Sequence, residues 1–323
     1  MRRFALLAAT SLACALAACG DREPPPAPVD AAAELAAAQA RDGAGDERGR
    51  DEALRRAAEG EGEPARRATT WLASIALQDD DPEGAEARLA AIVARFDGRA
   101  VDADGRDVNL AILAEAIAEK AATVARDRVN GPSPDSAAGA AAVTAGRRAL
   151  ERAGEGVEEL RAALDAAAAY VAVGNAPVDL SGLVDGAARG TGPVVVVFTD
   201  HFELGNAILP SVLKRWSKGL RVACVGIRVG KTRLGIRRVA ATPEEEDAAL
   251  EERVKELGLV WAGAAPEKDG ALRRLGIDPH SATVFVLDGG QTLRGRLSAR
   301  ALDPRPLDPI VASLAPAPAD DGR

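Results

Sequence analysis

The run from Val194 to Phe198 constrains the fold of this chain more than any other feature, because all five residues are apolar and four are valine. A strand with one face in water alternates apolar and polar residues, whereas an uninterrupted β-branched run is typical of a strand covered on both faces. Such strands occur in largely parallel sheets that carry helices on each side. The run therefore predicts an α/β domain in the C-terminal part of the chain.

The sequence on either side of this strand alternates between extended and helical patterns after Gly174. Gly289 and Gly290 separate two short apolar runs, which is typical of a hairpin turn. We expect further strands at 220–229, 283–288 and 291–298, and helices at 207–217, 243–257, 268–275 and 306–314. Together these elements predict a central mixed sheet flanked by helices over residues 178–314.

The preceding region, 51–173, carries apolar residues at helical spacing and predicts an all-α structure. Its segments 65–77 and 82–96 resemble the two helices of one tetratricopeptide unit. A stable array of such units needs about three repeats, so a generic helical bundle is the alternative.

Prolines and glycines divide this helical region. The segment from Asn130 to Pro134 contains two prolines and breaks the helical pattern. A long alanine-rich helix is expected to follow from about Val143 to Val173, with an interruption near Gly154 and Gly156.

The N-terminus has the pattern of an export signal. Arg2 and Arg3 precede the apolar run from Phe4 to Ala18, which is too short to remain as a helix across a bilayer. The sequence Leu16-Ala17-Ala18-Cys19 resembles the lipobox of bacterial lipoproteins, which implies that Cys19 receives a diacylglyceryl group and becomes the new N-terminus. An ordinary secretory peptide cleaved near Ala18 is the alternative.

The lipoprotein resemblance predicts a location in the cell envelope. Residues 1–18 are then a signal peptide, and residues 19–50, rich in Pro, Ala and Gly, are a flexible tether behind the lipid, inside which residues 31–40 could form a short helix. Gly20 rather than Asp follows Cys19, and the sorting rule of Gram-negative lipoproteins then implies the periplasmic face of the outer membrane. Residues 315–323 are expected to be a disordered tail.

The charge balance narrows the class of partner. A formal net charge of −8 at pH 7 argues against nucleic acid, since a phosphate backbone needs a basic face. We therefore expect contact with the membrane through the lipid anchor and with another envelope protein. A basic stretch, interpreted as a solvated hairpin edge or as a surface for an acidic partner, contains Arg228, Lys231, Arg233, Arg237 and Arg238.

Three cysteines occur in the whole chain: Cys14, Cys19 and Cys224. On the lipoprotein interpretation the first is removed and the second is lipidated, so Cys224 is the remaining thiol. A single thiol supports neither an intramolecular disulfide nor a two-cysteine redox cycle.

Three local matches over 178–314 resemble a thioredoxin-like domain of the peroxiredoxin, TlpA and Sco branch. These are Asp179-Leu180-Ser181-Gly182 before the first strand, the segment 258–277, and the segment from His280 to Asp288 entering the last hairpin. The resemblance implies a thioredoxin-like fold for this domain.

The catalytic residues of that family do not carry over. The position after the first strand, where the family has its reactive cysteine, is occupied by Phe202 in a degenerate loop that also holds Thr199 and Asn206. Ala282 stands where the family has a cis-proline, so a trans peptide bond is expected there. Cys224 lies mid-strand and is expected to be an inert core residue, so no catalytic residue is assigned and an enzyme is not the favoured interpretation.

Two histidines, His201 and His280, fall on the two loops that meet at the active-site end of this fold. His280-Ser281-Ala282 resembles the histidine loop of Sco-type copper chaperones. With Asp200 and Glu203 the histidines are candidate ligands of a divalent metal, and exposed loop residues without any ligand are the alternative.

These features leave three hypotheses. The first is a non-catalytic envelope lipoprotein that binds proteins through a redox-inactive thioredoxin-like domain and the helical region, with no cofactor. The second is a metal-binding or copper-chaperone-like protein that uses His201 and His280. The third is a thiol-redox protein that acts through Cys224 or a partner.

Overall fold

The computed structural model describes residues 29–131, 133–173, 177–184, 190–200, 202–205, 208–234, 237–266, 269–299 and 302–315, with the backbone alone for 232–234 and 237–238. The chain divides into two compact units, Met1–Ala68 and Thr69–Arg323, each considered by itself below. The signal segment, Cys19 and the C-terminal tail beyond Ala315 lie outside the described residues.

The first unit contains helices α2 (Ala31–Gly43) and α3 (Glu47–Glu59). The first covers the short helix considered at 31–40, whereas the second begins before residue 50, where the flexible tether was expected to end. The Asp30 side chain caps the first helix, and the Asp46 side chain caps the second by accepting from the Gly49 N–H at 3.0 Å. The alanine-rich sequence of the first helix favours a helix. The proline-rich composition, which is typical of a tether, is confined to the residues before it.

The second unit begins with helices separated by short turns. After α4 (Gly62–Gln78), which the unit boundary divides, come α5 (Pro82–Arg95), α6 (Leu110–Asp127), α7 (Ser136–Leu150) and α8 (Glu158–Ala172). The predicted helix at 82–96 and the predicted break near Gly154 are confirmed. The tetratricopeptide subtype stays a prediction.

A small antiparallel ladder interrupts the region that was expected to be all-α. Strand β1 (Ala100–Val101) pairs with β2 (Asp107–Val108). The Asp102 carboxylate accepts from the backbone N–H groups of Asp104 and Arg106, at 2.9 and 2.8 Å, and so forms the turn between them. Two-residue strands have too little periodicity to be visible in the sequence.

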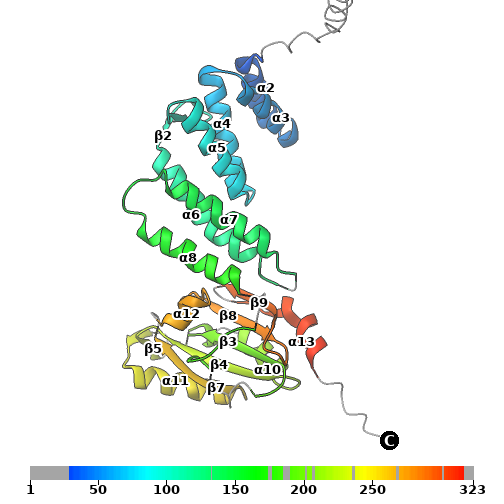
Figure 1. Ribbon diagram of the computed structural model, residues 1–323, viewed down its shortest axis with the longest axis vertical. Helices are drawn as coiled ribbons and strands as arrows, with labels where there is room; N and C mark the ends of the chain where they lie inside the picture. The colour runs from blue at the N-terminus through cyan, green and yellow to red at the C-terminus, as the bar shows by residue number, and fades with distance from the viewer. Residues whose placement is uncertain are drawn as a thin grey trace, which may run out of the picture. The chain divides into compact units, whose positions relative to one another are not determined.

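A five-stranded mixed sheet forms the C-terminal part of the second unit (Figure 1). Its order is β7-β4-β3-β8-β9, where β3 is parallel to β4, β4 is parallel to β7, and β8 is antiparallel to both β3 and β9. The strands are β3 (Val194–Thr199), β4 (Arg221–Arg228), β7 (Val260–Pro266), β8 (Ala282–Leu287) and β9 (Leu293–Ala299). All six residues of β3 are buried, as the valine run predicted.

The remaining elements also follow the sequence pattern, apart from β7, which was not predicted as a strand. The basic stretch forms a hairpin, in which β5 (Lys231–Leu234) pairs with β6 (Arg237–Ala240). The helices are α10 (Ile208–Trp216), α11 (Pro243–Glu256), α12 (Gly270–Arg274) and α13 (Asp308–Leu314). Thr242 and Glu245 close a capping box at the start of α11.

The two faces of the sheet belong to different hydrophobic clusters. Val195 and Val197 pack in one cluster with residues of α10, α11 and α13. Val196 and Phe198 face the other cluster, which extends continuously into α5, α6, α7 and α8. The helices and the sheet therefore share a core, and the compact-unit boundary falls at Ala68 rather than near residue 174, where the sequence pattern changes.

One arginine on β9 reaches from the sheet to the ends of two helices. Arg296 is 1 % exposed. Its Nε donates to the Val129 carbonyl at 3.1 Å, just after α6, and its Nη1 donates to the Val173 carbonyl at 2.7 Å, just after α8. Nη1 also donates to the Tyr170 carbonyl and Nη2 to the Val171 carbonyl at 3.3 Å. Carbonyls at a helix C-terminus have no intrahelical donor, so Arg296 supplies donors to both helices.

The charge of Arg296 is balanced without an ion pair to any carboxylate in the described residues. The negative ends of the α6 and α8 dipoles lie against it. Its guanidinium carbon is 4.5 Å from the centroid of the Tyr170 ring, a cation–π distance. Burial lowers the pKa of Arg296 to about 10, so the side chain remains protonated at neutral pH.

A glycine allows α12 to approach the backbone of α8. Gly276 follows α12 with φ +63°, and a Cβ at this position would lie 2.2 Å from the Ala166 carbonyl oxygen and 2.3 Å from the Tyr170 nitrogen. Both of these atoms belong to the backbone of α8, so a side chain has no room.

Within the described residues, no helix is both long and apolar enough to cross a membrane.

Replacing Arg296 by methionine should lower the free energy of unfolding by about 3 kcal/mol or more, because several buried carbonyls lose their donor. Urea unfolding followed by circular dichroism measures this loss. Arg294→Met is the matched control on the same strand: Arg294 pairs with Asp288 at the surface, and its loss should cost about 1 kcal/mol or less. Equal costs for the two variants would contradict the role given to Arg296.

Replacing Gly276 by alanine should destabilise the protein more than the same change at Gly258. Both glycines have positive φ, +63° and +70°, but a Cβ on Gly258 would meet nothing within 4 Å. Gly258→Ala should therefore cost about 1–2 kcal/mol of backbone strain. Gly276→Ala should cost about 1–3 kcal/mol beyond that, because α8 must move. Identical urea midpoints would show that α12 and α8 are not in tight contact.

Candidate functional site

The loop after β3 is built on an aspartate. The Asp200 Oδ1 accepts from the backbone N–H groups of Phe202 and Glu203, at 2.8 and 2.7 Å, and thereby starts the short helix Glu203–Gly205. Thr199, the last residue of β3, is buried and donates its hydroxyl to the Asp200 carbonyl at 3.2 Å. One Asp200 oxygen is thus committed to holding the loop.

An apolar surface stands where the resemblance places a reactive thiol. Phe202 is half-buried, and Ile208, the first residue of α10, is 43 % exposed. Glu203 is half-buried beside them. His201 and Asn206, the other predicted residues of this loop, lie outside the described residues.

The loop before β8 is held by a second aspartate. One Asp278 oxygen accepts from the His280 N–H at 3.0 Å, and the other accepts from the Ser281 hydroxyl at 2.9 Å. The His280 side chain is exposed, whereas Ala282 is buried as the first residue of β8. The peptide bond before Ala282 is trans, as expected for a non-proline residue.

The metal hypothesis is not decided by this geometry. Among the described residues, no group of three or more His, Cys, Asp or Glu side chains is arranged to hold a metal ion. His201 lies outside the described residues and stays a predicted ligand. Asp200, Glu203 and His280 stay predicted ligands.

Cys224 is a core residue, as predicted. It lies mid-strand in β4, opposite Val197 of β3 and Trp261 of β7, and is 0 % exposed. Burial raises the pKa of its thiol to about 12, so the thiolate does not form at neutral pH in the folded protein. A reactive cysteine needs the opposite environment, exposed and electropositive.

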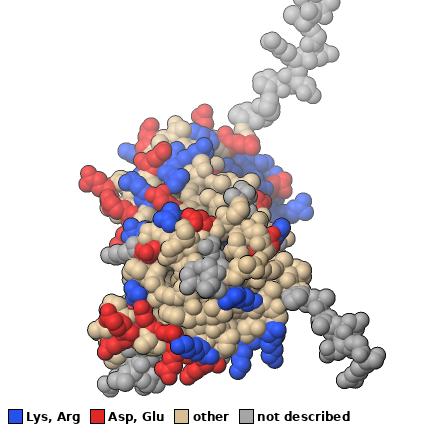
Figure 2. All heavy atoms as spheres, turned by 60° about the horizontal axis from the view of Figure 1, so that its bottom comes forward, with Lys and Arg blue, Asp and Glu red and all other residues tan. Residues whose placement is uncertain are grey.

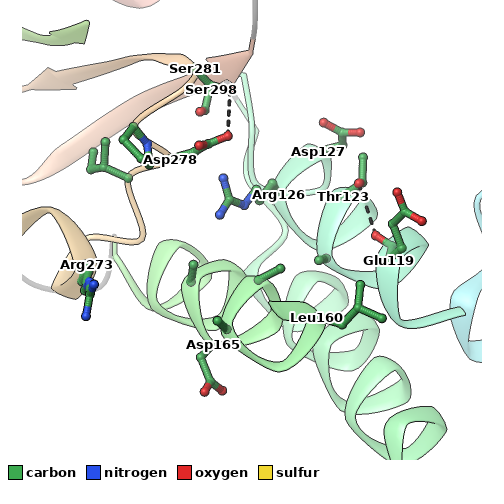
Figure 3. A pocket seen from close by; sticks show the side chains of 16 residues that line it. Glu119, Thr123, Arg126, Asp127, Leu160, Asp165, Arg273, Asp278, Ser281 and Ser298 are labelled. Atoms are coloured by element: carbon green, nitrogen blue, oxygen red, sulfur yellow. Dashed lines mark hydrogen bonds between the residues drawn. The ribbon is translucent and has the colours of Figure 1, made fainter. Parts of the chain in front are cut away.

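A cleft of about 1030 Å³ lies beside the loop before β8. Its walls are α6, α8, α12 and the segment from Ile277 to Ser281, all within the second unit (Figure 3). Its apolar lining includes Ala122, Leu160, Ala163, Ala166 and Ile277. The volume is at the upper end of the range for ligand sites.

Arg126 of α6 extends into this cleft, toward the loop that carries Asp278 (Figure 3). The side chain is half-buried and its guanidinium carbon is 5.9 Å from the centroid of the Tyr170 ring. The same ring lies under Arg296 at 4.5 Å. In the part of the chain that the structure describes, the Arg126 guanidinium makes no hydrogen bond or ion pair.

Three of the four carboxylates around the cleft already have partners. Asp278 accepts from the loop, as described above, Asp165 pairs with Arg147 at 2.7 Å, and Asp127 accepts from the Asn130 side-chain amide at 3.5 Å. Glu119 and Asp127 belong to α6, and Figure 3 shows Asp127 and Arg126 projecting from that helix in different directions. Desolvation by the cleft walls raises the pKa of Asp127, although part of its side chain reaches the surface. Arg273 of α12 is a second, more exposed cation at the rim.

One face of the molecule shows both signs of charge. On the face shown in Figure 2, acidic and basic side chains are interspersed. This mixture accords with the formal net charge of −8. It resembles a solvated protein surface more than a phosphate-binding face, which would gather Lys and Arg.

Comparisons of the chain with protein-family models, with curated proteins and with solved structures find no match.

The sequence analysis did not identify the residues that form the cleft. Arg126 stands in an amphipathic helix where charged residues are ordinary, and Arg296 alternates along the strand in step with the polar residues Arg294 and Ser298, as a surface residue would. Tyr170, the single tyrosine of the chain, was the one available signal, because a buried tyrosine needs a hydrogen-bond partner. Its hydroxyl donates to the Asn130 Oδ1 at 2.8 Å.

Proposed function

We propose that this chain is a non-catalytic, membrane-anchored lipoprotein of the bacterial envelope. In this proposal its C-terminal α/β part is a redox-inactive thioredoxin-like domain, and this domain and the helical region together bind another protein. The observation that carries the proposal is the burial of Cys224. This residue is 0 % exposed within the sheet, and it is far in sequence from the degenerate loop.

The strand order supports the thioredoxin-like assignment. In that fold a βαβ unit is followed by an antiparallel hairpin and a final helix, with the functional loops at the ends of the first strand and before the hairpin. Here β3, α10 and β4 are followed by β8, β9 and α13, with β7 added at the edge beside β4. The loops at Asp200 and at Asp278 are the corresponding positions.

Both of these loops are held by internal hydrogen bonds and present surfaces suited to binding. Phe202 and Ile208 offer apolar area at the first loop. The second loop forms one wall of the cleft that contains Arg126. Apolar area beside a small number of placed polar groups is the usual composition of a binding site.

The anchor rests on the lipobox-like sequence ending in Cys19. A diacylglyceryl group supplies two acyl chains, which give stable attachment where one chain gives reversible binding. The proposal places the protein on the periplasmic face of the outer membrane.

The non-catalytic part of the proposal predicts that Cys224 is silent in the folded protein. In the detergent-solubilised mature protein at pH 8, a chromogenic disulfide reagent should react only as fast as the protein unfolds, and fully in guanidinium. The pKa of the Cys224 thiol is about 12 in the folded protein, which is above its value in the unfolded chain. The thiol of the folded protein should therefore react slowly as the pH rises, until alkaline pH unfolds the protein. Insulin reduction with dithiothreitol should equal that of Cys224→Ala and of a blank. A reductase or peroxidase activity lost in Cys224→Ala would overturn the proposal.

The anchor predicts that Cys19 carries lipid. Cells that express the wild-type chain should incorporate labelled palmitate into it, and detergent but not high salt should release the protein from membranes. Cys19→Ser should abolish the labelling. Cys14→Ser, a matched change within the apolar segment, should leave labelling intact. Equal labelling of wild type and Cys19→Ser would exclude this lipidation site.

A further inference from the structure

The cleft beside the Asp278 loop contains a cation that forms no ion pair with the described residues. Arg126 is half-buried, and its contact there is the face of the Tyr170 ring at 5.9 Å. Arg296 lies against the same ring at 4.5 Å and is also without a carboxylate partner in the described residues. Backbone carbonyls balance the charge of Arg296, so Arg126 is the cation open to the cleft, where partial burial strengthens electrostatic interactions.

Among the described residues, no carboxylate that lines the cleft forms an ion pair with Arg126. Asp278 and Asp165 accept hydrogen bonds from other groups, and no oxygen of Glu119 or Asp127 lies within ion-pair distance of the Arg126 guanidinium. Glu119 and Asp127 lie on the α6 side of the opening, and Figure 3 shows them directed away from the guanidinium. A carboxylate that enters the cleft would thus reach Arg126 between α6 and the loop that carries Asp278.

The rest of the cleft fits a polypeptide better than a small anion. Its volume of about 1030 Å³ far exceeds one carboxylate group. Alanines of α6 and α8 line it together with Leu160 and Ile277, so apolar side chains next to the carboxylate would also be buried. Glu119 and Asp127 at the opening disfavour a strongly anionic ligand and favour one with a single acidic group.

We propose that the cleft binds a short segment of a partner protein in which one Asp or Glu side chain pairs with Arg126 and flanking apolar side chains cover the alanine-lined floor. A planar guanidinium holds a carboxylate through two parallel hydrogen bonds, which gives both affinity and orientation. This inference rests on the proposed function as a protein-binding module and names the chemistry of the segment that is bound.

A randomised hexapeptide library displayed on phage, selected against the immobilised mature protein, tests the proposal. The enriched peptides should share an Asp or Glu at one position with apolar neighbours. The affinity of the most enriched peptide, measured by fluorescence polarisation, should fall about tenfold or more in Arg126→Met. Arg161→Met is the matched control, because Arg161 is an exposed arginine of α8 that does not line the cleft.

A double-mutant cycle separates pairing from general loss of structure. Replacing the acidic residue of the peptide by its amide should weaken binding to the wild type about as much as Arg126→Met does, and should weaken binding to Arg126→Met no further. Ala163→Phe, which fills the cleft, should also abolish binding, and circular dichroism checks that each variant is folded. Arg126→Lys should retain part of the affinity.

No enriched peptide, enrichment without an acidic position, or additive losses in the cycle would each overturn the proposal. These outcomes differ from failure of the proposed function, which would appear as a thiol-dependent activity of Cys224. A protein that lacks such activity and also selects no acidic peptide remains a binding module that uses another surface.

Discussion

The hydrogen bonds of Arg296 join the five-stranded sheet to the helices α6 and α8. Burying a charged side chain costs free energy, which the lowered pKa of Arg296, about 10, reflects. The helices α6 and α8 end with carbonyls that lack donors, and burying those ends also costs free energy. The hydrogen bonds between Arg296 and these carbonyls reduce the cost of burying the charge and the cost of burying the helix ends. They also fix the position of β9 relative to both helices.

This contact explains why the cleft exists. Arg296 holds the C-terminal ends of α6 and α8 at the sheet, while Gly276 brings α12 against the α8 backbone. Small residues, mainly alanine, face the space between these fixed elements, so the space remains open. Tyr170 connects the two regions, since its ring contacts Arg296 on one hand and Arg126 in the cleft on the other. Stability and the candidate binding site therefore depend on the same aromatic ring.

The sequence predicted the parts of the fold that depend on local pattern. The valine run of β3, the helix after Thr242 and the hairpin of β8 and β9 follow from periodicity and turn residues. It did not predict β7, whose alanines and glycine have weak strand propensity, nor the start of α3 after Asp46, which composition assigned to a tether. Neither Arg126 nor Arg296 was predicted, because their roles depend on contacts between residues more than 40 positions apart.

The location of the free chemical groups argues for binding rather than catalysis. A thiol acts as a nucleophile only as an exposed thiolate, and Cys224 is fully enclosed in β4. Arg126, in contrast, is partly accessible and lines a cleft, where it lacks a described partner. A guanidinium cannot give up its proton near neutral pH and does not act as a base, but it binds a carboxylate strongly. The proposed binding function therefore rests on Arg126, a group suited to holding a carboxylate.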